Sequence, residues 1–202
     1  MTLSWYGHSC FKLDFNGETS VIFDPYAPGS VRGMEMPSII SADEVLCSHD
    51  HKDHNARNCV QLTGKLPAFE TKVLYSFHDK ENGKSRGPNK IHIVSYGDFR
   101  AAHFGDQGCM PDAEQLKQLK NLDLALIPIG GVYTIDPTEA KELIGLIQPR
   151  ITVPMHYRIG TTGLKGIAEL SEFTSLFDAV YQIGGKMEIT SGMRGIFCMY
   201  YR

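Results

Sequence analysis

The chain has 202 residues, of which 42% are hydrophobic and 21% are charged, and its formal net charge is -3 at pH 7. These values are typical of a globular protein and exclude an intrinsically disordered chain, and the slight negative charge provides no basic surface for nucleic acid. Since no apolar run is long enough for a membrane span or a secretory leader, we expect one cytoplasmic domain over residues 1–202, with neither a membrane nor nucleic acid as a partner.

The first 30 residues predict an antiparallel β-meander. Apolar and polar positions alternate from Leu3 to Phe23, and Asn16-Gly17 is a typical hairpin turn. Two prolines and a glycine within residues 24–29 cannot continue a strand, so the third strand ends there. After a loop, residues 44–47 form a short apolar strand, and a histidine-rich run follows it directly.

The rest of the chain predicts a mixture of strands and helices, with turns at residues 81–83 and 87–89. Asp136-Pro137-Thr138-Glu139 supplies a capping box and a first-turn proline, so the helix that it begins has the strongest signal. Helices are expected at residues 112–120, 136–147 and 167–177. Further strands are expected at residues 73–75, 90–94, 99–104, 122–127, 186–189 and 195–200. Together these elements predict a mixed α/β fold.

Three histidines and two aspartates occur within residues 49–54. Imidazole nitrogen and carboxylate oxygen are the ligands of open, catalytic zinc sites, whereas closed structural sites favour cysteine thiolates, which this run lacks. If the chain leaves the preceding strand extended, His49 and His51 point the same way and reach one metal ion. Asp53 and His54 are then displaced enough to reach a second ion.

Three alternatives compete with a catalytic metal site. A solvated polar loop would explain a single histidine, but not this density of them. A structural metal site is disfavoured by the carboxylates and by the loop setting. A covalent nucleophile within Gly7-His8-Ser9-Cys10 is also disfavoured, because the serine lacks the flanking glycines of a nucleophile elbow.

The run His-x-His-x-Asp-His after a strand resembles the signature of the metallo-β-lactamase superfamily. A downstream histidine, an aspartate in a Gly-Asp pair and a histidine near the C-terminal part follow in the order of that family, at His78, Asp106 and His156. Residues 7–11, 23–25 and 127–131 are similar to a small bacterial branch that includes L-ascorbate-6-phosphate lactonase. The resemblance extends over nearly the whole chain.

The resemblance implies a four-layer αββα sandwich with two divalent metal ions at one edge, between the sheets. Zinc is favoured, and manganese or iron would accept the same nitrogen and oxygen ligands. The implied ligands of the first ion are His49, His51 and His78, those of the second are Asp53, His54 and His156, and Asp106 bridges both. Asp53 is also expected to be catalytic, by orienting the attacking hydroxide. Gln107 departs from the family pattern, where a threonine often follows the aspartate, and this puts the support of Asp106 in doubt.

The predicted function is a hydrolase in which a metal-activated water cleaves an ester-type bond of a small anionic substrate, such as a lactone, a thioester or a phosphodiester. Four cationic side chains are candidates to receive the anionic group: Lys80, Lys84, Arg86 and Arg158. The oxidoreductase branch of the family is disfavoured, because its diiron members have a glutamate at the position of His51. A nuclease or phosphodiesterase acting on nucleic acid and a non-catalytic metal-binding sensor stay open as alternatives, and a homo-oligomer is compatible with this branch.

Three histidines remain outside the expected ligand set. His92 lies on a strand and is expected to be structural or on the surface. His103 precedes Asp106 by three residues, and an outer-shell role and a plain structural role are equally open. His8, near the start of the first sheet, is a candidate to hydrogen-bond beneath the metal loop.

Overall fold

The N-terminal meander forms the smaller of two main sheets in the computed structural model, which describes residues 1–201. Its strand order is β13-β1-β2-β3-β5, antiparallel from β13 to β3 and parallel between β3 and β5. The strands are β1 (Thr2–Gly7), β2 (Cys10–Phe15), β3 (Thr19–Phe23), β5 (Glu44–Leu46) and β13 (Lys186–Glu188). The predicted meander and its hairpin turn are therefore confirmed.

The larger sheet has the order β12-β14-β11-β10-β9-β8-β7. The hairpins β7-β8 and β8-β9 are antiparallel, and β9, β10, β11, β14 and β12 run parallel to one another. The strands are β7 (Glu70–Phe77), β8 (Pro88–Tyr96), β9 (Phe99–His103), β10 (Leu124–Pro128), β11 (Ile151–Met155), β12 (Tyr181–Ile183) and β14 (Gly195–Met199). A separate pair joins β4 (Ser41–Ala42) to β6 (Gln61–Leu62).

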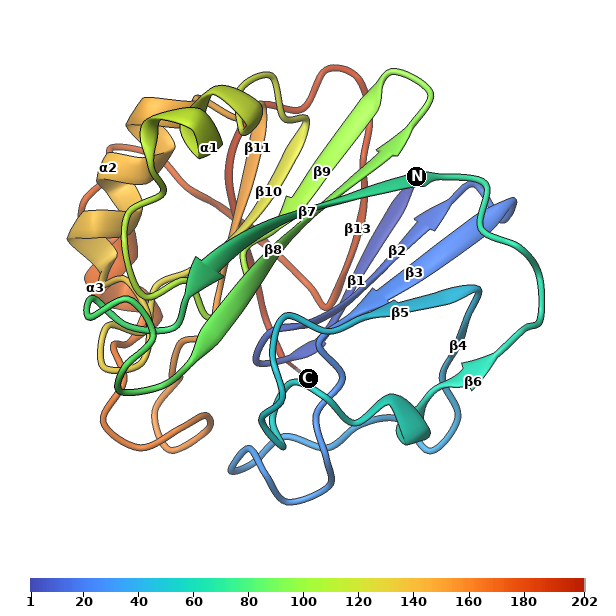
Figure 1. Ribbon diagram of the computed structural model, residues 1–202, viewed down its shortest axis with the longest axis horizontal. Helices are drawn as coiled ribbons and strands as arrows, with labels where there is room; N and C mark the ends of the chain where they lie inside the picture. Colours follow the sequence, from blue (N-terminus) through green and yellow to red (C-terminus); the bar gives the residue numbers. More distant parts are fainter. Residues whose placement is uncertain (202) are drawn as a thin grey trace.

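Three helices cover the outer face of the larger sheet (Figure 1). They are α1 (Ala113–Gln118), α2 (Pro137–Ile147) and α3 (Leu170–Thr174). Helix α2 has the predicted capping box between Asp136 and Glu139, and its apolar face buries Ala140, Leu143 and Ile147. None of the helices within residues 1–201 is long and apolar enough to cross a bilayer.

The two sheets enclose the main hydrophobic core, because alternate side chains of each strand face inward. In β3, Val21 and Phe23 point into this core, whereas Ile22 points outward into a second, smaller one. Residues 24–69 cover that outward face with loops, the β4-β6 pair and a 3₁₀ turn at Arg57–Cys59. The αββα class is confirmed, with the difference that all α-helices of the described residues lie over the larger sheet.

Two local predictions were wrong in their bounds, and strand β11 was not predicted. Residues 87–89 do not form a turn, because Pro88 and Asn89 begin β8 opposite Phe77 and Ser76. The helix predicted from residue 167 begins only at Leu170, since the main chain before it pairs with the 158 region and with Gly130. Strand β11 contains a proline. Pro154 is tolerated there, since β14 pairs with β11 only at Ile151 and Thr152.

Candidate metal centre

The residues of the predicted metal site lie at one edge of the two sheets. Strands β7, β9 and β11 run in the same direction, so their carboxyl ends meet at the same edge of the larger sheet. These ends place His78, Asp106 and His156. In the smaller sheet, β1 and β5 also share one direction, and their ends place His8 and the 49–54 loop. The topology thus brings distant parts of the chain to one place.

The first group of candidate donors is His49, His51 and His78, whose nearest ligand atoms all lie within 4.8 Å of one another. The ring of His49 lies 4.5 Å from that of His51 and 4.6 Å from that of His78, between centroids. His49 and His78 are buried, whereas His51 is exposed. The structure therefore brings together the three residues expected to hold the first ion.

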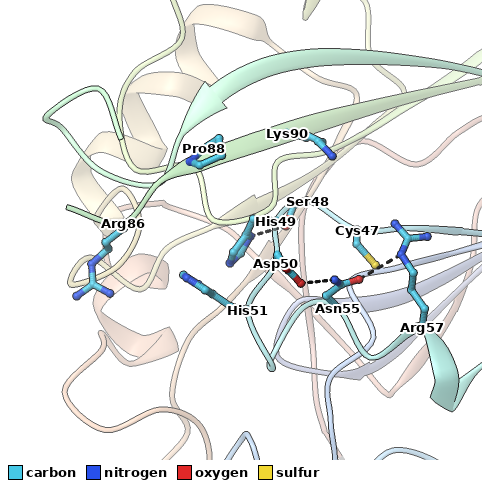
Figure 2. Close-up of a pocket in the computed structure, with 10 residues that line it drawn as sticks. All are labelled: Cys47, Ser48, His49, Asp50, His51, Asn55, Arg57, Arg86, Pro88 and Lys90. Atoms are coloured by element: carbon cyan, nitrogen blue, oxygen red, sulfur yellow. Dashed lines mark hydrogen bonds between the residues drawn. The ribbon is translucent and has the colours of Figure 1, made fainter. Parts of the chain in front are cut away.

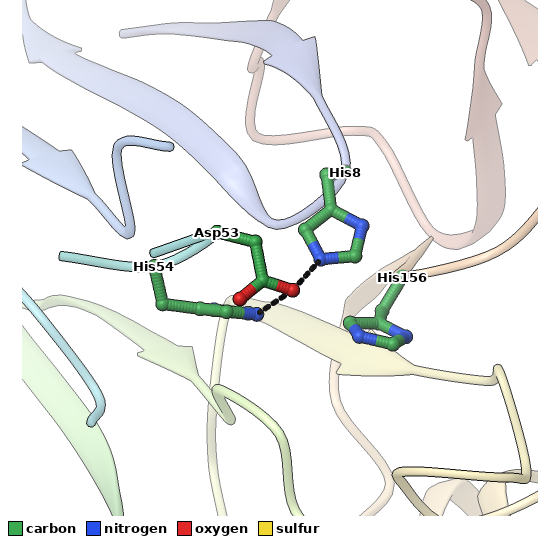
Figure 3. A group of neighbouring side chains, drawn as sticks. All are labelled: His8, Asp53, His54 and His156. Atoms are coloured by element: carbon green, nitrogen blue, oxygen red, sulfur yellow. Dashed lines mark ion pairs between the residues drawn. The ribbon is translucent and has the colours of Figure 1, made fainter. Parts of the chain in front are cut away.

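The second group contains Asp53, His54 and His156, as expected, and His8 in addition. The Asp53 Oδ2 atom lies 3.7 Å from His54 Nε2 and 3.4 Å from His8 Nε2. Figure 3 shows the His8 and His54 rings pointing at the Asp53 carboxylate, with His156 beside them. Sequence reasoning treated His8 only as an outer partner. The signal in the sequence that could have found it is its place in the segment of residues 7–11, which is one of those similar to the small bacterial branch.

Asp106 stands between the two groups. Its Oδ2 atom lies 3.1 Å from His78 Nε2, 3.2 Å from His54 Nε2, 3.3 Å from His156 Nε2 and 3.8 Å from His49 Nε2. One carboxylate oxygen therefore faces histidines of both groups. A carboxylate in this position has the geometry needed to bridge two ions.

The donor set also passes a test of fit for metal ions. Within residues 1–201, Nε2 of His8, His49, His54 and His156 and Oδ1 of Asp106 are buried without a hydrogen-bond partner. Buried polar atoms without partners are costly, so such a concentration of them indicates a missing partner. Donor atoms in a tetrahedron around zinc, at about 2.0–2.1 Å from it, lie roughly 3.3–3.4 Å apart, which is close to the separations found here. The residues fit metal ions.

The electrostatics of the cluster favour metal over protons at several donors. Burial, followed by the nearby His54, lowers the pKa of His49 to about 3. Burial and the neighbouring His156 lower the pKa of His8 to about 4. Both rings are therefore neutral at pH 7 and have a lone pair for a metal ion.

The carboxylates of the cluster are ionised at neutral pH. Burial alone would raise the pKa of Asp106, but His156 and His54 outweigh burial and hold that pKa well below its ordinary value. Burial by itself would lower the pKa of His54. The Asp106 and Asp24 carboxylates outweigh burial and raise that pKa well above its ordinary value. His54 therefore carries a proton between two carboxylates, and a metal ion at Nε2 would take the place of that positive charge.

A buried carboxylate, Asp24, orients one histidine of each group. Its Oδ2 atom accepts hydrogen bonds from His54 Nδ1 at 2.8 Å and from Ser48 Oγ at 2.6 Å, and its Oδ1 atom accepts one from Ser48 N at 2.7 Å. Since the Ser48 hydroxyl donates to Asp24, it accepts from His49 Nδ1 at 2.9 Å (Figure 2). Both rings are thereby fixed with Nε2 free for a metal ion.

The turn that holds Asp106 is supported by Asn89 and Gln107. Asn89 Oδ1 accepts the hydrogen bond of Asp106 N at 3.0 Å, and Asn89 Nδ2 donates to Phe104 O and to Gln107 Oε1. Gln107 Nε2 in turn donates to Ser76 Oγ at 2.7 Å. The glutamine therefore ties the turn to β7, which answers the doubt about this departure from the family pattern. The preceding Gly105 leaves no room for a side chain, because its Cβ would lie 2.3 Å from Ser48 Cβ.

The other two histidines have structural contacts. His92 is buried, which agrees with the predicted structural role and not with a place on the surface. Its Nε2 atom forms a hydrogen bond with Cys47 O at 3.0 Å. His103 Nε2 donates to Ser9 O at 2.9 Å, and its Nδ1 accepts from Gly105 N at 3.1 Å. Each ring thus joins the two sheets just beneath the metal loop.

The metal groups open into a cavity of about 480 Å³. Five candidate donors line it, namely Asp53, Asp106, His51, His78 and His156, and the other lining residues are Lys52, Arg86, Tyr133, Leu164 and Lys165. Asp53 is the more accessible of the two carboxylates, with 21% of its side chain exposed against 3% for Asp106. A small molecule can therefore reach the donor groups from solvent.

Comparison with known proteins agrees with this geometry. A family model described as the β-lactamase superfamily domain matches residues 2–156, a span that includes every candidate donor. Proteins named metal-dependent hydrolase from Caldivirga maquilingensis and Nitratidesulfovibrio vulgaris are each 30% identical to this chain over 77% of its length, and the matches cover 81% and 79% of those proteins.

A solved structure from Thermotoga maritima, provisionally assigned as a zinc-dependent hydrolase of the metallo-β-lactamase superfamily, superposes with a TM-score of 0.77. It is 27% identical in sequence, and the match covers 98% of this chain and 97% of that one. The chain therefore belongs to the metallo-β-lactamase superfamily, as one of its metal-dependent hydrolases.

Proposed function

We propose that the chain binds two divalent metal ions, zinc above all, and hydrolyses an ester-type bond of a small anionic molecule. The observation that carries this proposal is the position of Asp106 Oδ2 between the imidazoles of His78, His54 and His156. The first ion would be held by His49, His51 and His78, the second by Asp53, His54 and His156, with Asp106 shared between them.

The residues of the site divide the chemical work. Two ions bound here would lower the pKa of a shared water and polarise the carbonyl or phosphoryl oxygen of the substrate. Asp53 lines the cavity and is accessible from it, so its carboxylate can orient the attacking water and accept its proton. No side-chain nucleophile is needed, because the attacking group is the water itself.

The charges that line the cavity support an anionic substrate. Lys52, Arg86 and Lys165 belong to the lining, and its carboxylates are Asp53 and Asp106, whose charge the metal ions would neutralise. The Arg86 guanidinium stacks over the Tyr133 ring, 4.1 Å from its centroid. A phosphate or carboxylate group of the substrate would therefore meet an oriented guanidinium in the cavity.

The loop that presents Arg86 is held in shape by Asp79. The Asp79 carboxylate accepts hydrogen bonds from the main-chain N–H groups of Glu81, Gly83, Ser85 and Arg86, at 2.7 to 3.0 Å. Because Asp79 directly follows His78, the loop is anchored at the first metal group. The position of Arg86 relative to the metal site is thus set by the main chain.

Arg86 is the one of the four cationic candidates that borders the metal cavity. Lys80 pairs with Glu139, and Arg158 pairs with Glu169 at 2.6 Å in a different cavity. Lys84 is not among the residues that line the metal cavity. A second cavity of about 310 Å³ adjoins His49 and His51, and it is lined by Arg57, Arg86 and Lys90 (Figure 2). Arg86 therefore borders both of these spaces, and it also lines a smaller cavity beside His78 together with Lys80.

The function is tested by metal analysis and a substrate panel. We expect about two ions per chain in the purified protein and turnover of at least one anionic lactone, thioester or phosphodiester. Asp53→Ala is expected to abolish that turnover, because it removes both a donor and the group that accepts the proton. Two ions without turnover of any ester would support a metal-binding sensor, and cleavage confined to nucleic acid would support a nuclease. Either outcome would contradict the proposal.

The role of Arg86 is tested by Arg86→Ala, with Lys84→Ala as the matched control on the same loop. A charge-assisted contact at this exposed position is worth about 1 kcal/mol, so KM for an anionic ester should rise roughly fivefold with little change in kcat. KM for an uncharged ester of similar size should stay the same. Equal effects of the two variants, or equal effects on both esters, would count against a role in substrate recognition.

A further inference from the structure

His8 lies at the corner between β1 and β2 and is completely buried. Within residues 1–201, neither of its ring nitrogens has a hydrogen-bond partner. A neutral imidazole contains one donor and one acceptor, so both are left unsatisfied in the interior. This is costly unless another group occupies the space in front of the ring.

Two other buried histidines show what a structural role requires in this fold. His92 bonds through Nε2 to Cys47 O, and His103 bonds through Nε2 to Ser9 O. Each of these rings is anchored to a main-chain carbonyl, whereas His8 has no such bond. The His8 ring is therefore placed for contact with something other than the protein main chain.

The His8 ring is aimed at the second group of donors (Figure 3). Its Nε2 atom lies 3.4 Å from Asp53 Oδ2, and its ring centroid lies 4.2 Å from that of His156 and 5.0 Å from that of His54. A separation of 3.4 Å is long for a hydrogen bond, but it equals the spacing of about 3.3–3.4 Å expected between two donors on one zinc ion. The geometry fits two ligands of a shared ion.

The backbone at His8 is held in an unusual conformation that directs the ring inward. His8 has a φ angle of 53°, which is in the left-handed region and uncommon for a residue other than glycine. Its carbonyl oxygen accepts hydrogen bonds from Trp5 Nε1 at 3.0 Å and from His156 N at 3.4 Å. His156, itself at a φ of 54°, is thus tied to His8 through the main chain. Strained backbone supported in this way is typical of functional sites.

We infer that His8 is a further nitrogen ligand of the second metal ion, which it binds through Nε2 together with Asp53, His54 and His156. This inference rests on the two-ion site proposed above. It makes the two positions unequal, because the second ion would be held by one protein donor more than the first.

The experiment compares His8→Asn with His92→Asn, which removes a buried imidazole outside the donor groups. Asparagine tolerates the left-handed backbone at position 8. Zinc and cobalt(II) are titrated into each metal-free protein. Loss of an outer-shell partner costs 10- to 100-fold in metal affinity, so loss of a ligand should weaken binding of the second equivalent by about 100-fold or more. The cobalt absorption spectrum of the second equivalent should change, and one shifted imidazole N–H proton signal should disappear. His92→Asn should bind both equivalents as the unmodified protein does.

An unchanged second equivalent and an unchanged cobalt spectrum in His8→Asn would overturn the inference, while the two-ion site would stand. Failure of the unmodified protein to bind two ions would instead refute the proposed function. If His8→Asn does not fold, a crystal structure of the unmodified zinc-loaded protein decides the matter. His8 Nε2 at about 2.0–2.1 Å from the second ion supports ligation, and a distance beyond about 3 Å excludes it.

Discussion

Asp106→Asn is expected to release at least one metal ion and to lower kcat/KM by about a thousandfold or more. The carboxylate lies within 3.3 Å of histidines from both groups, so one negative charge would serve two cations. Asparagine retains the shape but removes that charge from a buried position. Metal-ion stabilisation of the transition state amounts to several kcal/mol, and about 4 kcal/mol corresponds to a thousandfold change in rate.

The measurement is metal content by elemental analysis, together with kcat/KM on the best substrate of the panel. Asp123→Asn is the control, since Asp123 pairs with Arg150 at 2.9 Å and lies next to the N-terminal end of β10, away from the site. It should keep both ions and full activity. Retention of two ions at unchanged affinity in Asp106→Asn would show that this carboxylate does not bridge them.

Asp24→Asn is expected to weaken binding of both ions, although Asp24 is not itself one of the candidate metal ligands. Asp24 accepts hydrogen bonds from Ser48 N, Ser48 Oγ and His54 Nδ1. An amide NH₂ at this place would face groups that are themselves donors, so a buried donor loses its partner and the free energy of unfolding falls by about 1–3 kcal/mol. His54 can then turn or change tautomer, and His49 loses its orientation through Ser48. Metal affinity should fall roughly 10- to 100-fold at each position.

Thermal unfolding of the metal-free protein and metal titration check the two parts of this prediction separately. Asp43→Asn is a suitable control, because Asp43 accepts a main-chain hydrogen bond from Ser20 at 2.8 Å in the same sheet region but has no contact with the metal groups. It should leave metal affinity unchanged. Loss of stability in Asp24→Asn with unaltered metal binding would reduce Asp24 to a structural role.

Local sequence determined the elements that depend on near neighbours in the chain. The turn at Asn16-Gly17 and the capping box of Asp136 with Glu139 depend only on contacts between residues a few positions apart. Their structures can therefore be predicted from the local sequence. The shift of the predicted turn at residues 87–89 has a tertiary cause. Pro88 and Asn89 pair with β7 and support the Asp106 turn, which the local glycine and proline pattern does not reveal.

The sequence by itself also determined which residue types could bind metal. Three histidines and two aspartates between His49 and His54 indicate a metal site whatever fold the chain adopts. The family resemblance also predicted His78, Asp106 and His156 as distant members of the cluster, but only the tertiary structure showed that they meet it and that His8 lies among them. β1 and β5 share one direction in the smaller sheet, and β7, β9 and β11 share one direction in the larger sheet, and the ends of these strands carry the residues that meet at the site. Strand direction depends on long-range pairing. The segments around His8 and Asp24 share the family resemblance, but neither they nor Asn89 show from the sequence which group they contact, because those contacts arise from long-range strand pairing.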